Sequence, residues 1–429
     1  MLKVIVRKEF LDQFMSAKFA ILTILCFFLF LITFFSSKTD YERRLSECQK
    51  AIQDRNEGKG LPSDILKVFR RPEVLSIFSQ GYDRKFGNTL DFSSAPLRLV
   101  SYMGEESLQD FSSIDFEFLV RVILSLSAVF LAYDVISGER EAGTLRLTLS
   151  NSVERGKLLL GKFFGGLLSL FIPLLLGFIV GLLIASFSPT VVLKGAEYVR
   201  LGFVFFVSFL YLTSFFTLGM FISTLTKRSK VTLLVTLFIW VILLFIVPNA
   251  SWEIAKKIKK TPSLESIAKQ VDAARLSVKE KDFRTLSTTQ LMIKSQRELN
   301  EIERRKKERI YQQIELSRWL SSFSPASVYS YATQVFARTN ISSYQRFLQF
   351  INAKWDIYNK KLLEWDNLPV EERRKREYEY NTRFKEEFRV PKERIEESLD
   401  NALVDIFLLF LFSFFFYFSA YLSFLRYEV

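Results

Sequence analysis

Residues 138–166 read GEREAGTLRLTLSNSVERGKLLLGKFFGG, and this stretch changes character half-way along. Charged and polar side chains dominate its first half, whereas leucine, phenylalanine and glycine dominate its second half. A polar loop that passes directly into a long apolar run is typical of a chain that enters a lipid bilayer. The stretch therefore predicts an integral membrane protein with a charged loop at one membrane surface.

The same stretch contains a near match to a nucleotide-binding loop. Residues 156–162 have the spacing G-x-x-x-x-G-K, but Phe163 stands where such a loop needs a serine or threonine hydroxyl to hold magnesium. The loop must also connect a buried strand to a helix, whereas polar residues precede Gly156 and an apolar run follows it. We therefore expect that this chain does not hydrolyse ATP and binds no cofactor itself.

The composition of the 429-residue chain disfavours a soluble enzyme. Hydrophobic residues make up 49% of it, they are gathered into unbroken runs, and there is no histidine. The lack of histidine removes the commonest general base and the commonest transition-metal ligand. The two cysteines, Cys26 inside an apolar run and Cys48 outside it, predict neither a disulfide framework nor a cysteine-based zinc site.

Six apolar runs are long enough to cross a bilayer, which takes about 20 mostly apolar residues. The predicted spans are residues 19–37, 116–136, 158–187, 201–225, 231–249 and 402–425. Residues 1–18 form a basic, amphipathic lead-in, and two large polar segments remain at 38–115 and 250–401. The predicted fold class is an all-α integral membrane protein with six transmembrane helices and a helical extracytoplasmic domain.

Lysine and arginine in the short loops predict the orientation, because basic residues resist translocation. They occur before the first span, in the loop at 137–157, in the TKRSK turn at 226–230 and at Arg426 after the sixth span. Six crossings put all of these on one side, so we expect both termini in the cytoplasm and both large segments outside. Nucleic-acid binding is not expected, because the outer charges alternate in sign instead of forming one positive stripe.

The large outer segments have helical composition. Residues 266–283 and 291–320 are rich in lysine, glutamate, arginine and leucine and contain no proline or glycine. Ser324-Pro325 predicts the end of the second of these helices, and further helices are expected at 342–365 and 370–388. A solvated helical bundle with a modest apolar seam accounts for this pattern.

The charged loop at 137–157 allows two interpretations. It can be a solvated turn whose basic residues only fix the topology, or it can be a surface that contacts another protein. Gly143-Thr144 interrupts the charges and precedes a short helix, in which leucines at 145, 147 and 149 alternate too quickly for a clean amphipathic pattern.

This loop and the span after it resemble ABC transporter permeases of the ABC-2 type. That family has an acidic E-x-x-x-G-T pattern, a short helix, and a G-K that enters the next span. Its acidic pattern falls here on Glu139, Gly143 and Thr144, and its basic re-entry on Arg155, Lys157, Gly161 and Lys162. The N-terminal KVIVRKEFLDQFMSAKF is similar to the family's amphipathic elbow, and the chain is most similar to the subgroup with long inserts after the first and fifth spans.

The resemblance implies partners as well as a fold. A permease of this family pairs with a second copy or a paralogous permease in the inner membrane of a prokaryote. Each permease docks on a separate cytoplasmic ATPase, and that subunit holds the ATP and magnesium. The docking residues implied here are Glu139, Arg140, Glu141, Gly143, Thr144, Arg146 and Arg155.

Inside the spans, small residues predict close helix packing. Gly161, Gly165, Gly177 and Gly181 recur at four-residue spacing within the third span. Four ionisable residues lie near span ends, where their side chains can reach the interface: Asp115, Arg121, Asp134 and Lys162. No ionisable residue lies clearly at mid-bilayer, which argues against a proton- or sodium-coupled carrier.

Residues 318–336, RWLSSFSPASVYSYATQVF, are rich in aromatics and poor in charge. The aromatic side chains concerned are Trp319, Phe323, Tyr329, Tyr331 and Phe336. They can lie at the outer surface of the bilayer, or they can form the core of the outer domain against residues 38–115. The sequence leaves both placements open.

Three functions follow from these patterns. The first is a membrane-spanning permease subunit of an ATP-driven exporter, energised by a separate ATPase. The second is a subunit that transmits ATP-driven motion to an extracytoplasmic protein without passing a solute. The third is a membrane-anchored scaffold or enzyme, which the lack of histidine and cysteine in the segment at 250–401 disfavours.

Overall fold

The computed structural model describes residues 2–56, 67–83, 89–91, 114–150, 153–260, 288–366, 368–369 and 392–426, with short pieces at 265–266, 269–270 and 272–273. Its six longest apolar helical stretches confirm the predicted all-α membrane fold. They are α2 (Ala17–Asn56), the stretch Phe116–Glu141, α8 (Arg155–Ser186), α9 (Gly195–Leu225), the stretch Ser229–Ile258 and α17 (Ile395–Leu425).

Two of the six stretches are built from several pieces. The stretch Phe116–Glu141 consists of α4 (Phe116–Phe118), the π-helical η3 (Leu119–Leu124), α5 (Ser125–Ala132) and α6 (Ser137–Glu141). The stretch Ser229–Ile258 consists of α10 (Ser229–Val241), the π-helical η4 (Ile242–Ile246) and α11 (Val247–Ile258). A wide turn of this kind lets a helix change direction without losing its backbone hydrogen bonds.

Several helices run beyond their predicted spans because polar residues continue them. The helix α2 has 40 residues, so that at about 1.5 Å per residue it reaches well past the roughly 30 Å of hydrocarbon. It follows α1 (Leu2–Phe14), and the Ser16 hydroxyl at the break accepts a hydrogen bond from the Phe19 backbone N–H. Apolar composition therefore defines the membrane portion of each helix but not its ends.

The helix α9 lies at the centre of the bundle and packs against α17, α14 (Pro325–Ala337) and α5. Several of its buried hydroxyls donate to carbonyl oxygens one turn back in the same helix, as Ser208 does to Val204 and Thr213 to Phe209. These bonds satisfy the polar groups internally, which a helix surrounded by apolar neighbours requires.

The outer part is mainly helical, as the composition predicts. It contains α13 (Thr288–Ser321) and α15 (Ile341–Asp366), which match the helices expected at 291–320 and 342–365. The short helix η2 (Val74–Ile77) and a small antiparallel pair, β1 (Lys67–Phe69) with β2 (Thr89–Asp91), were not expected. The helix predicted at 370–388 and most of the one predicted at 266–283 lie outside the described residues.

The position of α14 differs from both placements that the sequence allows. The Tyr329 ring stacks on the Tyr211 ring of α9 with centroids 4.4 Å apart. Tyr211 lies about 14 residues, and so about 21 Å, from the end of α9 at Leu225, which is within the thickness of the hydrocarbon. The helix α14 therefore lies among the outer halves of the spans, where α9 and α17 cover it.

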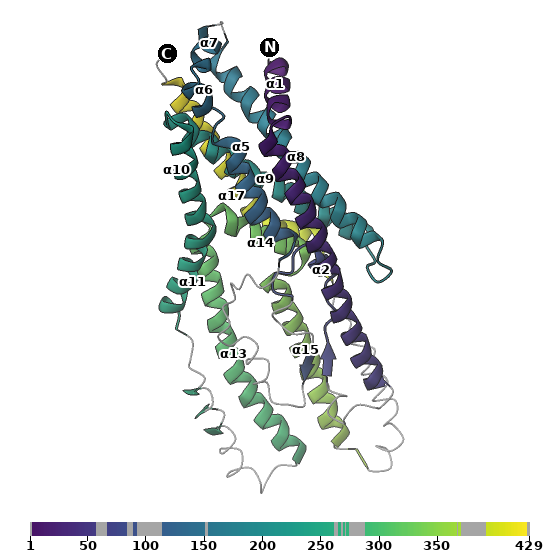
Figure 1. Ribbon diagram of the computed structural model, residues 1–429. Coiled ribbons are helices and arrows are strands. Elements are labelled where there is room, and N and C mark those ends of the chain that lie inside the picture. Colours follow the sequence, from purple (N-terminus) through teal and green to yellow (C-terminus); the bar gives the residue numbers. More distant parts are fainter. Residues whose placement is uncertain are drawn as a thin grey trace.

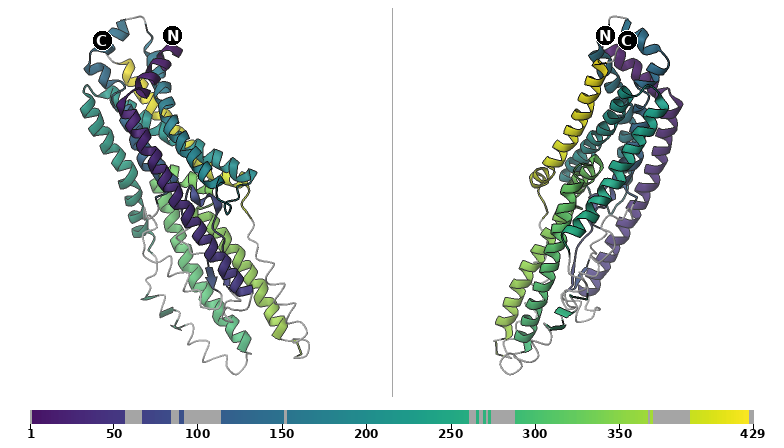
Figure 2. Two further views of the ribbon diagram at one scale, coloured as in Figure 1. Left: turned by 45° about the vertical axis from the view of Figure 1, so that its right-hand side comes forward. Right: turned by 90° about the vertical axis from the view of Figure 1, so that its left-hand side faces the viewer.

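Both chain ends lie at the same end of the molecule as α6 and α7 (Thr144–Ser150), as Figure 1 shows. The helices α13 and α15 and the distal part of α2 extend toward the opposite end, and the views in Figure 2 agree. An even number of crossings requires this arrangement. The charged loop and the outer helices are thus at opposite ends of one elongated bundle.

Candidate functional site

The charged loop folds into two short helices joined by a tight turn. The first is α6, the second is α7, and Gly143 between them has φ +74°, a conformation that glycine adopts without strain. The helix α7 begins at Thr144, whose hydroxyl donates to the Glu139 carbonyl 3.2 Å away. The loop is therefore a defined structure that projects from the end of the bundle.

The leucine alternation in α7 has a structural explanation. Leu145 is buried and Leu149 is half-buried, whereas Leu147 between them is 71% exposed. Arg146 beside it is also exposed. The helix α7 thus packs against the bundle through Leu145 and presents Leu147 and Arg146 outward, and arginine is among the residues enriched where proteins contact one another.

Four of the seven predicted docking residues make polar contacts with parts of the chain outside α6 and α7. Arg140 donates to the Thr226 carbonyl at 3.2 Å, and the Glu141 carboxylate accepts from the Ser229 backbone N–H at 3.0 Å. Arg155 donates to the Leu425 carbonyl at 2.7 Å. These three tie the loop to the turn between α9 and α10 and to the end of α17.

Glu139 is the fourth, and its carboxylate faces inward. It lies 2.7 Å from the Lys162 ammonium, which is 1% exposed and also lies 3.0 Å from the Glu9 carboxylate. The expectation that Lys162 reaches the membrane interface is therefore wrong, because ion pairs with two helices hold it inside the protein. Glu141, Gly143, Thr144 and Arg146 are the predicted docking residues that remain exposed, and Glu141 is also bonded to Ser229.

The four glycines of α8 that the sequence predicts to pack closely all meet side chains of the first two helices. A Cβ atom at Gly161 would lie 2.4 Å from Ile5 Cγ2, and one at Gly165 would lie 2.7 Å from Glu9 Cβ, both on α1. Further along α8, a Cβ atom at Gly177 would lie 2.4 Å from the Phe30 ring of α2, and one at Gly181 would lie 2.3 Å from the Phe34 ring. Because glycine has only a hydrogen atom in place of a side chain, α1 and α2 can approach α8 closely at these positions.

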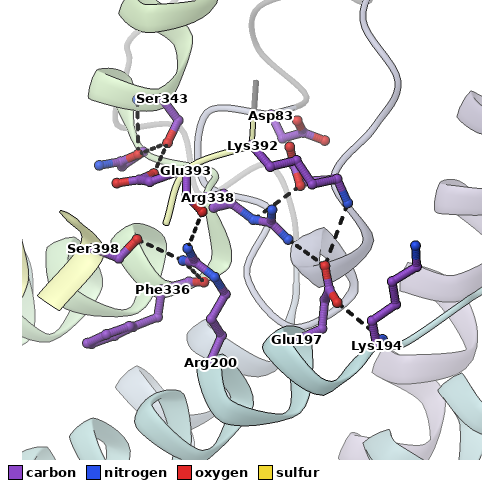
Figure 3. A network of polar contacts seen from close by, with 12 residues as sticks. Asp83, Lys194, Glu197, Arg200, Phe336, Arg338, Ser343, Lys392, Glu393 and Ser398 are labelled. Carbon is purple, nitrogen blue, oxygen red and sulfur yellow. Dashed lines mark hydrogen bonds and ion pairs between the residues drawn. The ribbon is translucent and has the colours of Figure 1, made fainter. Parts of the chain in front are cut away.

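At the other end of the bundle, a buried polar network joins the spans to the outer helices (Figure 3). Arg200 of α9 is 1% exposed and donates to Ser398 Oγ at 2.8 Å and to the carbonyls of Phe336, Glu393 and Arg394 at 3.3, 2.8 and 3.1 Å. One guanidinium therefore holds the end of α14 against the start of α17.

Arg338 is the second cation of this network. Its guanidinium Nη2 lies 2.9 Å from Glu197 Oε1, and its Nε lies 3.5 Å from Glu73 Oε2. Burial raises the pKa of Glu73 above its ordinary value despite the nearby Arg338. Burial, with Glu117 beside it, also raises the pKa of Asp115 to about 7, although two backbone N–H groups favour its ionised form.

The aromatic segment at 318–336 divides into two parts. Trp319 and Phe323 are 71% and 75% exposed, so an interfacial position remains a prediction for them. The interfacial prediction is wrong for Tyr329, which is buried and hydrogen-bonded to Ser208 at 3.1 Å. Tyr331 is half-buried, and its hydroxyl bonds the Ser321 hydroxyl at 3.1 Å.

Sequence reasoning missed Leu147, Arg200 and Arg338 as candidate functional residues. An exposed leucine on a two-turn helix looks like any other leucine, and Leu147 stood out only through the unexplained alternation. Arg200 lies at the start of a long apolar run, and an arginine there is usually assigned to the interface. The role of each of these residues depends on neighbours in space that are distant in the sequence.

Comparison with known proteins gives a consistent result. Residues 3–428 match the family described as ABC-2 family transporter protein. The chain is also similar to the probable ABC transporter permease protein NosY of Pseudomonas aeruginosa, with 50% identity over 60 residues, and of Stutzerimonas stutzeri, with 48% over 60. Each alignment covers 14% of this chain and 22% of the relative. Because the family match spans nearly the whole chain, the protein belongs to the ABC-2 family transporter proteins, as a multi-pass member with six apolar helices in the part of the chain that the structure describes.

Proposed function

We propose that this chain is the membrane-spanning permease subunit of an ABC exporter, energised by a separate cytoplasmic ATPase that holds the ATP and magnesium. The observation that carries the proposal is the projecting helix α7, which exposes Leu147 and Arg146 at the end of the bundle where both termini lie. Family membership supports an ABC transporter subunit, and the near match to a nucleotide-binding loop falls on the membrane helix α8.

The docking surface in this proposal consists of Gly143, Thr144, Arg146 and Leu147. The loop is connected to the spans by the bonds of Arg140 and Glu141 to the α9–α10 turn and of Arg155 to the end of α17. A displacement of the docking surface is therefore transmitted to these helices. A second copy of the chain or a paralogous permease completes the transporter within the lipid bilayer. The complex lies in the inner membrane of a prokaryote with both termini in the cytoplasm.

Leu147→Asp is expected to weaken binding of the partner ATPase by more than about 1 kcal/mol, roughly fivefold, because it puts a charge into the apolar centre of the contact. Arg146→Glu is expected to weaken it as well, through a reversed charge. The measurement is the dissociation constant between the ATPase and the permease in nanodiscs. Ile357→Asp is the matched control, since Ile357 is a 47% exposed apolar residue on the outer helix α15. Equal affinities for all three variants would exclude α7 as the docking surface.

The orientation is tested by cysteine labelling from outside intact cells. With Cys26 and Cys48 replaced by serine, a cysteine at the exposed Glu301 of α13 is expected to react with a membrane-impermeant maleimide. A cysteine at the exposed Ala142 of the loop is expected to react only after the membrane is permeabilised. Labelling of position 142 in intact cells would contradict the proposed topology.

One observation favours a second function, the transmission of motion to an extracytoplasmic protein. The helix α2 runs without a break from the membrane into the outer part, and Arg200 fixes α14 to the start of α17. Movement of the spans would therefore displace the outer helices. If the complex transmits motion, the amide hydrogen-exchange rates of α13 and α15 in the reconstituted complex must differ between the ATP-bound and ADP-bound states. Solute transport alone does not require such a difference.

A further inference from the structure

The buried cation Lys162 joins three helices that are far apart in the sequence. It lies on α8, and it pairs with Glu9 of α1 at 3.0 Å and with Glu139 of α6 at 2.7 Å. The lysine side chain is 1% exposed, whereas the two glutamates are 12% and 23% exposed. Removing a carboxylate partner from a charge this deeply buried is strongly destabilising.

The orientation of Glu139 shows what this residue can contact. Its Oε1 atom faces Lys162, and its Oε2 atom is buried without a hydrogen-bond partner among the described residues. One carboxylate oxygen is therefore engaged by Lys162, and the other is buried away from a protein that approaches α7 from outside. This distinguishes Glu139 from Arg146 two turns later, which is exposed.

Packing around Lys162 makes α1 and α8 move together. Gly161, one residue before the lysine, sits against Ile5, and Gly165 sits against the Glu9 stem and the Phe10 backbone N–H. These contacts are too close for α1 to slide along α8 without separating from it. The ion pair to Glu139 then connects the loop to this two-helix body.

A second ion pair joins the start of α2 to the turn just before α6, and it is weaker. Lys18 pairs with Asp134 at 2.6 Å, but the two side chains are 52% and 36% exposed. Exposed pairs of this kind are screened by water and salt and contribute little. Of these two ion pairs, the one at Lys162 is the one that can transmit force.

We propose that Lys162 is the positioning residue that carries movement of the docking surface to α1, and that Glu139 acts through Lys162 and not by touching the ATPase. The inference rests on the proposed function, because it assumes that an ATPase moves the loop. It changes the role of Glu139 from the ATPase contact that the family resemblance implies to an internal one. It also implies that the N-terminal helix α1 moves with the loop when the ATPase moves the loop.

The test uses Glu139→Gln in the complex of permease and ATPase, because this variant leaves Lys162 paired with Glu9. We expect unchanged affinity for the ATPase and a fall in the ATP hydrolysis rate of the complex of about 2- to 30-fold, the range found for residues that couple sites. Lys162→Arg is expected to retain the rate, because a guanidinium can bridge the same carboxylates. Lys18→Gln, which breaks the exposed pair, is the matched control and is expected to behave as wild type.

A distance measurement on the permease alone tests the mechanical link directly. Spin labels at the exposed Lys8 of α1 and Ala142 after α6, in a chain with Cys26 and Cys48 replaced by serine, report how firmly the loop is held to α1. We expect a narrow distance distribution in the parent chain and with Lys162→Arg, and a broad one with Glu139→Gln.

The outcomes separate this inference from the proposed function. If Glu139→Gln weakens ATPase binding as much as Arg146→Glu does, Glu139 is itself a contact and the inference is overturned. If the distance distribution and the hydrolysis rate both stay unchanged, Lys162 does not couple the loop to α1. If neither Leu147→Asp nor Arg146→Glu affects binding, the docking surface is wrong, while the distance measurement still decides whether Lys162 holds the loop.

Discussion

Replacing Arg200 with methionine is expected to lower the free energy of unfolding by about 3–5 kcal/mol, the range found when one partner of a buried charged contact is removed. The Arg200 guanidinium contacts four acceptors at the junction of α14 and α17, and no water is expected to replace it there because the residue is 1% exposed. Methionine fills most of the same volume but leaves these acceptors without a donor, and each buried unpaired acceptor costs about 1–3 kcal/mol.

The measurement is the midpoint of thermal unfolding of the purified chain in one detergent, with its dependence on denaturant. Lys392→Met is the matched control, because Lys392 belongs to the same network but is 66% exposed and lies 3.6 Å from Glu197. An exposed pair of this kind contributes only about 0–1 kcal/mol. Arg200→Lys is expected to fall between the two, since an ammonium keeps the charge but not the fork of donors. Equal midpoints for Arg200→Met and Lys392→Met would mean that the network does not hold α14 to α17.

The sequence predicts the six apolar helices because lipid imposes a simple requirement on a span. Each span must be apolar over about 20 residues, and this is visible in the residues themselves without reference to any partner. The helix ends are not predictable in the same way. The helix α2 continues through TDYERRLSECQKAIQDRN because these residues favour helix in water, so the end of its apolar run does not show where the helix ends.

The candidate site is predictable only in part, for a different physical reason. The charged loop and its short helix can be located because glycine and the change from charge to leucine are local signals. The partners of Lys162 and Arg200 are not local: Glu9 lies 153 residues from Lys162, and Ser398 lies 198 residues from Arg200. A cation at the end of an apolar run looks the same in sequence whether it reaches the interface or pairs inside the bundle.

The position of Tyr329 illustrates the same limit for aromatic residues. Its segment is poor in charge, which predicts an apolar neighbour but not which one. In the structure the neighbour is Tyr211 of a span, so the segment enters the bundle and joins neither the bilayer surface nor a separate outer core. Only Trp319 and Phe323, before the turn at Ser324-Pro325, retain the exposure that an interfacial position needs.

The glycines of α8 provide the second large effect. In the double variant Gly177→Leu, Gly181→Leu, each added side chain meets a phenylalanine ring of α2 at the first carbon, 2.4 Å from Phe30 and 2.3 Å from Phe34. Both rings are buried in a cluster with Phe116 and Phe78, so they have no free space to enter. Overpacking of this kind costs about 1–3 kcal/mol per site, so we expect a loss of about 2–6 kcal/mol for the pair.

Gly202→Ala separates this steric effect from the general effect of removing glycine from a helix. Gly202 lies within α9, and a Cβ atom there has no neighbour within 4 Å. Alanine is expected to stabilise the chain slightly at this position, by about 0.5–1 kcal/mol, because glycine loses more backbone entropy in a helix. Adding Phe30→Ala and Phe34→Ala to the leucine pair makes room on α2, so the thermal midpoint should recover in part. If the leucine pair unfolds at the midpoint of the parent chain, or if enlarging the space on α2 brings no recovery, α8 and α2 do not meet through these glycines.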